Sequence, residues 1–277
     1  MSFLVLLLVL FAEKFSGLRR LVQRDGPWTH ALAGCEARGW TERMPWLALG
    51  LLVLAPAVVA ALLVQSIKPI AYGWLALPLH LLILLYSLGR GDVRREVGPF
   101  EAAWRRSDEQ GAALAAQRDL NIEAADAGEL LTRVRTYLLG EAFQGLFVVV
   151  FWYVLLGPAV ALAYRLIALA QSHGRREPMV ERARQLRHAF EWLPARVLAA
   201  SFALVGDFSA VNRALLPLLL DWYVSSRQLV ALTGCAAIGC EVPATTGDAA
   251  RLDALWSLAI RAAALWYAAF AVWVLLR

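Results

Sequence analysis

Residues 46–64 read WLALGLLVLAPAVVAALLV, a stretch of 19 positions without one charged side chain. A helix needs roughly 20 apolar residues to cross about 30 Å of hydrocarbon, so this stretch predicts a membrane span. Lipid offers no partner to backbone N–H and C=O groups, and the span must therefore be helical. Pro56 inside it predicts a kink that packs against a neighbouring helix. The stretch places the chain among membrane proteins.

Three more stretches extend this reading along the chain. Residues 69–89, with Pro78 inside them, 146–164 and 254–276 are also predicted to span the membrane. The composition agrees, since 60% of the residues are hydrophobic and the mean hydropathy is +0.57. The predicted fold is an all-α, polytopic membrane helix bundle in a single membrane domain, 1–277.

Two apolar segments, 2–12 and 197–206, are too short for a complete crossing. The first resembles the apolar part of a secretory signal. However, no positive charge precedes it, and no small-residue cleavage site follows before Glu13. We therefore expect it to be retained.

The basic residues predict the orientation. Residues 13–45 contain six Lys or Arg and residues 90–145 contain eight, whereas residues 65–68 contain only Lys68. Because cytoplasmic loops are enriched in positive charge, the first two predicted spans should leave from and return to the cytoplasm. The spans and this distribution predict a multi-pass protein with lipid as its surroundings; the resemblance described below implies that the membrane is the cell inner membrane.

Beyond residue 146 the sequence conflicts with the enrichment of positive charge in cytoplasmic loops, because a full crossing by 146–164 would place the arginine-rich stretch 165–196 outside. Two alternatives resolve this conflict. The helix breaks at Gly157-Pro158, or residues 197–220 return across the membrane. The sequence leaves both open.

Residues 90–145 are predicted to form a cytoplasmic helical insertion. Leucine and valine recur at helical spacing from Phe100 to Leu139, and no proline interrupts them. Breaks near Gly111, Asn121 and Gly128 predict two or three helices, packed over the cytoplasmic face of the bundle.

Several kinds of chemistry find no motif in this sequence. It contains no P-loop, HExxH, GxSxG or GxGxxG pattern. Its three cysteines and four isolated histidines predict no metal site and no disulfide framework. The arginines are interleaved with acids, so the net charge of +5 does not indicate nucleic-acid binding. We expect no metal and no cofactor.

Polar side chains at the edges of, or inside, apolar stretches are the first candidate site residues. They are Glu13, Glu141, Gln144, Arg165 and Arg261. Such residues usually face the bundle interior or a hydrated cavity, where they pair with one another. Arg165 lies near a predicted helix end, so snorkelling to the interface is an equal alternative for it. For Arg261 we expect an acidic partner or a cytoplasm-facing cavity.

The most compact group of candidates is residues 191–196, EWLPAR, which precede an apolar run. Pro194 suits the first turn of a helix, where its missing N–H has no partner in any case. One interpretation is a membrane-entry helix anchored by Trp192. The other is an anion or carboxylate site at Arg196, with Glu191 as ion-pair partner or base.

These residues resemble a known family. WLPAR at 192–196 is similar to the Asn-Trp-Ile-Pro-Ala-Arg signature of the CobD/CbiB membrane enzymes, which form an amide bond during cobalamin synthesis. EAFQG at 141–145 with Phe151-Trp152 is similar to that family's Glu-Asn-x-x-Asp-Gly and Phe-Trp. Tyr164-Arg165 is similar to its Tyr-Arg/Lys.

Within this superfamily the chain resembles the AmpE proteins, inner-membrane proteins linked to β-lactamase induction. The shared features are an apolar start that ends in Glu13-Lys14, an acidic residue before Trp192, and a basic residue, Arg261, in the last span.

The departures from the synthase pattern concern carboxylates. Gln144 stands where the synthases have Asp, residues 169–172 read LAQS instead of Thr-Leu-Asp-Ser, and Arg187-His188 replaces an Asp pair. If those acids hold Mg²⁺ against ATP phosphates, their loss removes that metal site. The cobalamin reaction is therefore not expected.

The resemblance implies a signalling or accessory protein, not an enzyme, in the regulation of β-lactamase induction and the cell-wall stress response. Its ligand would be a small anion or a cell-wall-derived metabolite. The alternative is a membrane-embedded enzyme with another substrate, and only this alternative calls for ATP or Mg²⁺. In both cases we expect the surviving polar residues to form a ligand pocket. Its candidate residues are Glu13, Glu141, Gln144, Tyr164, Arg165, Glu191, Trp192, Arg196 and Arg261.

Overall fold

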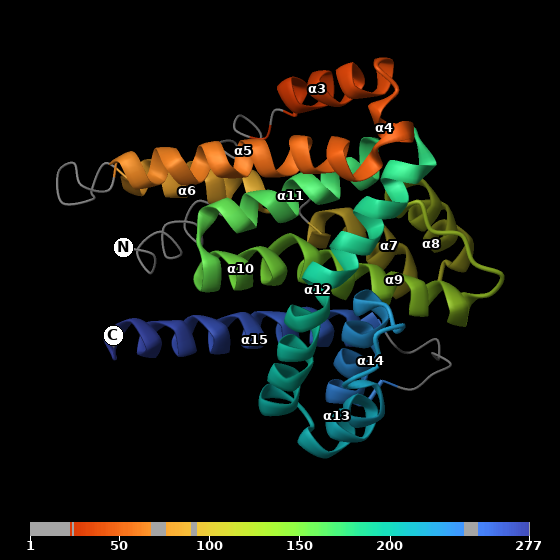
Figure 1. Cartoon of the computed structure of the whole chain (residues 1–277). Helices are drawn as coiled ribbons and strands as arrows, with labels where there is room; N and C mark the ends of the chain where they lie inside the picture. The colour runs from red at the N-terminus through yellow and green to blue at the C-terminus, as the bar shows by residue number, and fades with distance from the viewer. Residues whose placement is uncertain (1–22, 24, 68–75, 90–92, 241–248, 277) are drawn as a thin grey trace. The chain divides into compact units, whose positions relative to one another are not determined.

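The computed structural model of the chain is built from helices (Figure 1). It describes residues 23, 25–67, 76–89, 93–240 and 249–276, and within these ranges no strand occurs. The all-α prediction is confirmed. The apolar segment 2–12, Glu13 and the beginning of the predicted span 69–89 lie outside the described residues.

The chain divides into two compact units. Unit 1 takes the described residues up to 89 and Val148–Phe190, and unit 2 takes those from 93 to 147 and Glu191–Leu276. The predictions of one domain and of a cytoplasmic insertion at 90–145 stay predictions.

Unit 1 is organised around one central helix. Its elements are α3 (Gly26–Ala37), α4 (Trp40–Arg43), α5 (Pro45–Ile67), α6 (Ala76–Ser87), α10 (Val148–Leu156), α11 (Pro158–His173) and the first part of α12 (Glu177–Val205). α11 packs against α5, α6 and α10. The core that results includes Trp28, Leu49, Ile167 and Met179, all buried.

In unit 2, α14 takes the central place. The elements are α7 (Val93–Arg105), α8 (Glu109–Ala115), the π-helical turn η2 (Ala116–Leu120), α9 (Ala127–Ala142), the π-helical turn η3 (Phe143–Phe147), the rest of α12, α13 (Phe208–Leu215), the 3₁₀ turn η4 (Leu216–Leu218), α14 (Ser226–Ile238) and α15 (Ala249–Leu275). α14 packs against α9, α13 and α15.

Three helices are long and apolar enough to cross a membrane: Pro45–Ile67, Ala127–Leu156 and Arg251–Val274. The first and the third coincide with the predicted spans 46–64 and 254–276. Ala76–Ser87, within the predicted span 69–89, is apolar but shorter.

The predicted span 146–164 is not one helix. α10 ends at Leu156, Gly157 has φ of +90°, and Pro158 opens α11, which packs against α10. A positive φ strains any residue with a Cβ, and proline suits the first helical position, so these two residues make the turn. Of the two alternatives, the structure has the break. The spanning length comes instead from α9 and η3, which continue without interruption into α10.

Two of the three predicted breaks in 90–145 are displaced. Asn121, with φ of +55°, does end η2. Gly111 and Gly128, however, lie in the first turns of α8 and α9. Those helices start where Asp108 and Asp126 accept hydrogen bonds from backbone N–H groups three residues later. Aspartate caps, not glycines, decide the boundaries.

Pro56 lies inside α5, and the side chain of Trp28 replaces the hydrogen-bond donor that Pro56 lacks. Because proline has no backbone N–H, the carbonyl of Leu52, four residues earlier, loses its usual donor. The indole Nε1 of Trp28, in α3, donates to this carbonyl at 3.1 Å, and the contact is buried. Trp28 therefore joins α3 to α5 by completing the helix that Pro56 interrupts.

This contact predicts a thermodynamic coupling between Trp28 and Pro56. Trp28→Phe leaves a buried carbonyl unsatisfied and should lower the free energy of unfolding by about 1–3 kcal/mol. In a Pro56→Ala background the loss should be smaller, because the new N–H can donate to Leu52. Thermal midpoints of the four proteins in one detergent measure the coupling.

The control for this cycle is Trp46→Phe, since Trp46 is exposed at the start of α5. Equal losses for Trp28→Phe with and without Pro56 would contradict the contact.

Candidate functional site

Three of the nine predicted pocket residues meet in unit 2 around a residue that the sequence did not single out. Arg227, in the first turn of α14, forms an ion pair with Glu141. Its Nε also donates to the side-chain oxygen of Gln144 at 2.8 Å. The side-chain nitrogen of Gln144 in turn donates to Glu191 at 2.8 Å. We call these four residues, Glu141, Gln144, Glu191 and Arg227, the polar chain.

The π-helical turn η3 contributes to this geometry. Glu141 stands in the last turn of α9, and Gln144 lies within η3. A π turn inserts an extra residue and re-aims the side chains beside it, and such turns are frequent at functional sites. Here both side chains reach the same guanidinium.

Small residues let α14 come close enough. A Cβ on Gly140 would lie 3.2 Å from Cγ of Arg227, and one on Gly234 would lie 2.5 Å from Cδ1 of Leu139. The two glycines thus leave room for the stem of Arg227 and for Leu139. Because α9 and α14 approach each other closely, Arg227 reaches Gln144, which lies 83 positions earlier in the sequence.

The members of the polar chain differ in exposure. Glu191 is 5% exposed, whereas the side chains of Glu141 and Arg227 are 35% and 39% exposed. A further polar contact stands on the same helix, where the hydroxyl of Tyr137 donates to Glu96 at 2.9 Å. The site thus holds a buried carboxylate at one end and a partly exposed carboxylate–guanidinium pair at the other.

Arg196 does not join the polar chain. Its guanidinium is buried and donates to three backbone carbonyls, those of Trp192, Leu219 and Asp221 at 3.1, 3.0 and 2.6 Å. It also stacks on the Trp192 ring, 4.2 Å from the centroid. Burial lowers the pKa of the Arg196 guanidinium, and the negative charge of Asp221 raises it. With these contacts Arg196 holds the loop after η4, and an anion site at Arg196 stays a prediction.

Pro194 is also placed differently from the prediction. It lies in the interior of α12, not in the first turn of a helix. The carbonyl of Phe190, four residues earlier, loses its usual donor, and the indole Nε1 of Trp152 donates to it at 3.0 Å. An outside donor makes an interior proline tolerable, just as Trp28 does for Pro56.

Two more predicted residues belong to unit 1. Tyr164 is buried and its ring stacks on Phe190, with centroids 6.5 Å apart. Arg165 is partly exposed and interacts electrostatically with Tyr86, whose hydroxyl donates to Asp25 at 3.2 Å. They take part in unit 1 packing, and convergence of Arg165 with the polar chain stays a prediction.

Arg261 lies in α15 with an exposed side chain. Among the described residues no acidic side chain is paired with it. The predicted acidic partner of Arg261 is not found in this part of the chain.

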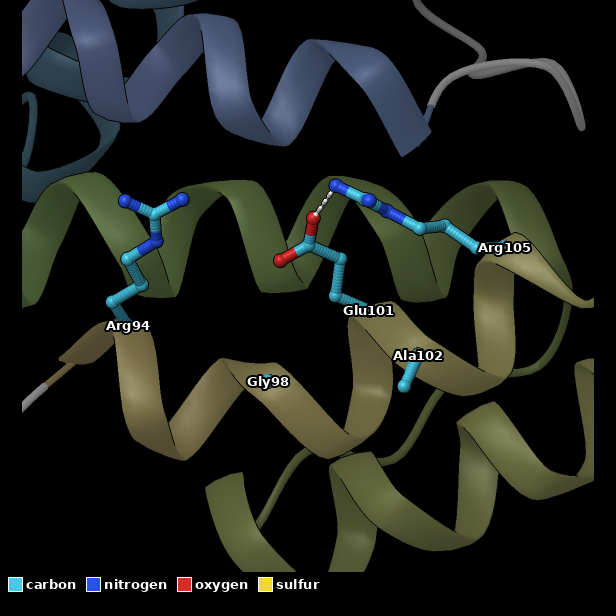
Figure 2. A pocket seen from close by; sticks show the side chains of 5 residues that line it. All are labelled: Arg94, Gly98, Glu101, Ala102 and Arg105. Atoms are coloured by element: carbon cyan, nitrogen blue, oxygen red, sulfur yellow. Dashed lines mark hydrogen bonds and ion pairs between the residues drawn. The ribbon is translucent and has the colours of Figure 1, made fainter.

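A second group of charges lines a shallow hollow of about 340 Å³ on α7 (Figure 2). Arg94, Glu101 and Arg105 point to the same side, over the small residues Gly98 and Ala102. Both arginines also bond to Asp253 at the start of α15. The side chains of Arg94, Arg105 and Asp253 are largely exposed, and ion pairs at exposed positions contribute about 0–1 kcal/mol. We therefore interpret the hollow as a solvated contact of α7 with α15.

Residues 1–265 match the family described as the regulatory signalling modulator protein AmpE. The chain belongs to the AmpE family. It is also 24% identical, over 197 residues, to the protein AmpE of Shigella flexneri, a comparison that covers 66% of this chain and 68% of that protein. No solved structure matches the chain.

In this AmpE-family chain the described residues contain no group of three His, Cys, Asp or Glu side chains placed to hold a metal ion. An amide, Gln144, and not a third carboxylate lies between Glu141 and Glu191. Its amide donates to Glu191 while accepting from Arg227, which a carboxylate at this position cannot do.

The polar chain predicts that Arg227 needs its forked geometry. Arg227→Lys keeps the charge but cannot bond Glu141 and Gln144 together, so the free energy of unfolding should fall by about 1–2 kcal/mol. Thermal midpoints in one detergent measure the loss. The matched control is Arg118→Lys, because Arg118 pairs with Asp119 at the exposed surface and should change little. Equal shifts for the two variants would contradict a structural role for the fork.

Proposed function

We propose that this AmpE-family chain is an inner-membrane signalling protein that modulates β-lactamase induction and the cell-wall stress response. The observation that carries the proposal is the family match over residues 1–265. Helices that are long and apolar enough to cross a membrane support a membrane location for it.

The polar chain is the part of the protein that suits a signalling ligand. Arg227 offers a guanidinium to a carboxylate, which would compete with Glu141 for it. Gln144 and Glu191 offer an amide and a carboxylate to N–H groups. A small metabolite released from the cell wall that carries both carboxylate and amide groups fits this combination. Binding would exchange Glu141 for the ligand at Arg227 and so change how α9 is held to α14.

A second candidate is a membrane-embedded enzyme related to the CobD/CbiB amide synthases, with another substrate. The observation in its favour is that one side chain, Gln144, separates the carboxylates Glu141 and Glu191 along a single chain of hydrogen bonds. Against it, the amide of Gln144 stands where an acid would complete a set of three carboxylates. We therefore favour a binding site over a catalytic one.

Complementation separates the protein's role from the role of the site. The wild-type gene should restore inducible β-lactam resistance to a deletion strain. Glu191→Gln removes the charge that accepts from Gln144, and Arg227→Lys removes the fork, so both should restore resistance poorly at normal protein levels in the membrane. Glu109→Gln, at an exposed position of α8, is the control and should complement fully.

Failure of the proposed function and failure of the proposed site give different results in this experiment. If the wild-type gene does not restore resistance, the proposed function is wrong. If Glu191→Gln and Arg227→Lys complement as well as Glu109→Gln does, the function stands but the polar chain is not its site. Mass spectrometry of small molecules that co-purify with the wild-type protein and not with Arg227→Lys identifies the ligand.

A further inference from the structure

Unit 2 carries an exposed apolar surface that its own helices do not cover. Leu220 is 82% exposed and Tyr223 is 94% exposed, both in the loop between η4 and α14. We call the exposed large apolar residues from α13 to this loop the apolar rim: Phe208, Leu216, Leu220, Trp222 and Tyr223. A water-soluble surface rarely gathers so many, and such patches mark interaction sites.

Several backbone groups beneath the apolar rim find their partners inside the protein. Nε and Nη2 of Arg196 donate to the carbonyls of Leu219 and Asp221. The carboxylate of Asp221 accepts from the N–H of Tyr223 at 2.8 Å. Irregular backbone is tolerated at membrane depth only where its polar groups find partners in the protein. Arg196 meets this condition for the carbonyls of Leu219 and Asp221.

A second exposed apolar surface lies on α12. Its exposed apolar residues recur at intervals of four, three and four positions and so form one stripe along the helix: Leu193, Val197, Ala200 and Leu204. No charged residue occurs from 197 to 206. Arg196 stands beside this stripe in sequence and bonds to the loop of the apolar rim, which ties the two apolar surfaces together.

We propose that the apolar rim and the α12 stripe dock into the interfacial region of the bilayer, and that Arg196 is the positioning residue that shapes the rim for this contact. The bilayer is the occupant that the observations favour, because this chain also carries helices long enough to cross it. α13 has 8 residues, about 12 Å of helix, and Asp207, Arg213 and Asp221 are charged, so the region cannot cross about 30 Å of hydrocarbon. Trp222 and Tyr223 carry the amphipathic rings that settle at headgroup level.

The test measures lipid contact at Leu220 directly. Leu220→Cys is made in the full chain after Cys35→Ala, Cys235→Ala and Cys240→Ala, and the single thiol is labelled with an environment-sensitive fluorophore. The labelled protein is placed, one copy per nanodisc, in phosphatidylcholine and phosphatidylglycerol. The matched control is Glu109→Cys in the same background, at an exposed position of α8.

The expected result is a blue-shifted emission at position 220 and a loss of fluorescence when the lipids carry bromine on their acyl chains, with neither change at position 109. An aqueous emission at 220 would overturn the proposal. A blue-shifted emission without bromine quenching would also overturn it, because protein rather than lipid would then cover the rim.

A second variant tests the role of Arg196. Arg196→Lys keeps the charge but cannot hold two carbonyls with one fork, so bromine quenching at 220 should fall. Arg118→Lys, at an exposed position of unit 2, should leave the quenching unchanged. Unchanged quenching in well-folded Arg196→Lys would remove the positioning role assigned to Arg196. Neither measurement depends on β-lactamase induction.

Discussion

Backbone carbonyls that have lost their helical donor are the constraint on which this structure depends. Lipid provides no substitute donor, so each carbonyl must find one in the protein. Trp28 serves the carbonyl opposite Pro56, and Trp152 serves the one opposite Pro194. Arg196 does the same for the irregular turn after η4. In all three cases a side chain with an N–H group fixes one element to another, so the repair of a local defect also determines the packing.

The polar chain follows the same logic for side chains. Buried polar groups cost free energy unless they are hydrogen-bonded, and a buried carboxylate costs more. Glu191 is 5% exposed, and Gln144 and Arg227 connect it to Glu141. Gln144 makes this connection possible with one side chain, because its amide donates to Glu191 and accepts from Arg227.

The sequence predicted the elements that a single physical property decides. Apolar length identified 46–64, which has no charge, and 254–276, which has only Arg261, as helices fit to span a membrane, since length and apolarity are local. Hydropathy alone predicted one span at 146–164. The break at Gly157-Pro158 was one of two open alternatives, and the backbone conformation of these two residues decides for it. Pro194 was misplaced for a related reason: a proline in the middle of a helix can be recognised only when its outside donor, Trp152, is known.

The candidate site was predicted in part. Glu141, Gln144 and Glu191 stood out as polar residues beside apolar sequence, and the structure joins them. Arg227 did not stand out, because its place beside Gln144 depends on how closely α9 and α14 approach at Gly140 and Gly234. Arg196 was noticed for its chemistry, but its partners are backbone carbonyls, which no motif displays.

The most direct test of the carbonyl constraint is hydrogen exchange at one indole. The N–H of Trp152 can be followed by NMR of the ¹⁵N-tryptophan-labelled protein in nanodiscs, with Trp152→Phe to assign its signal. Its exchange should be slow in the wild type and faster after Pro194→Ala, because the new backbone N–H competes for the Phe190 carbonyl. An exchange rate that Pro194→Ala leaves unchanged would contradict the account.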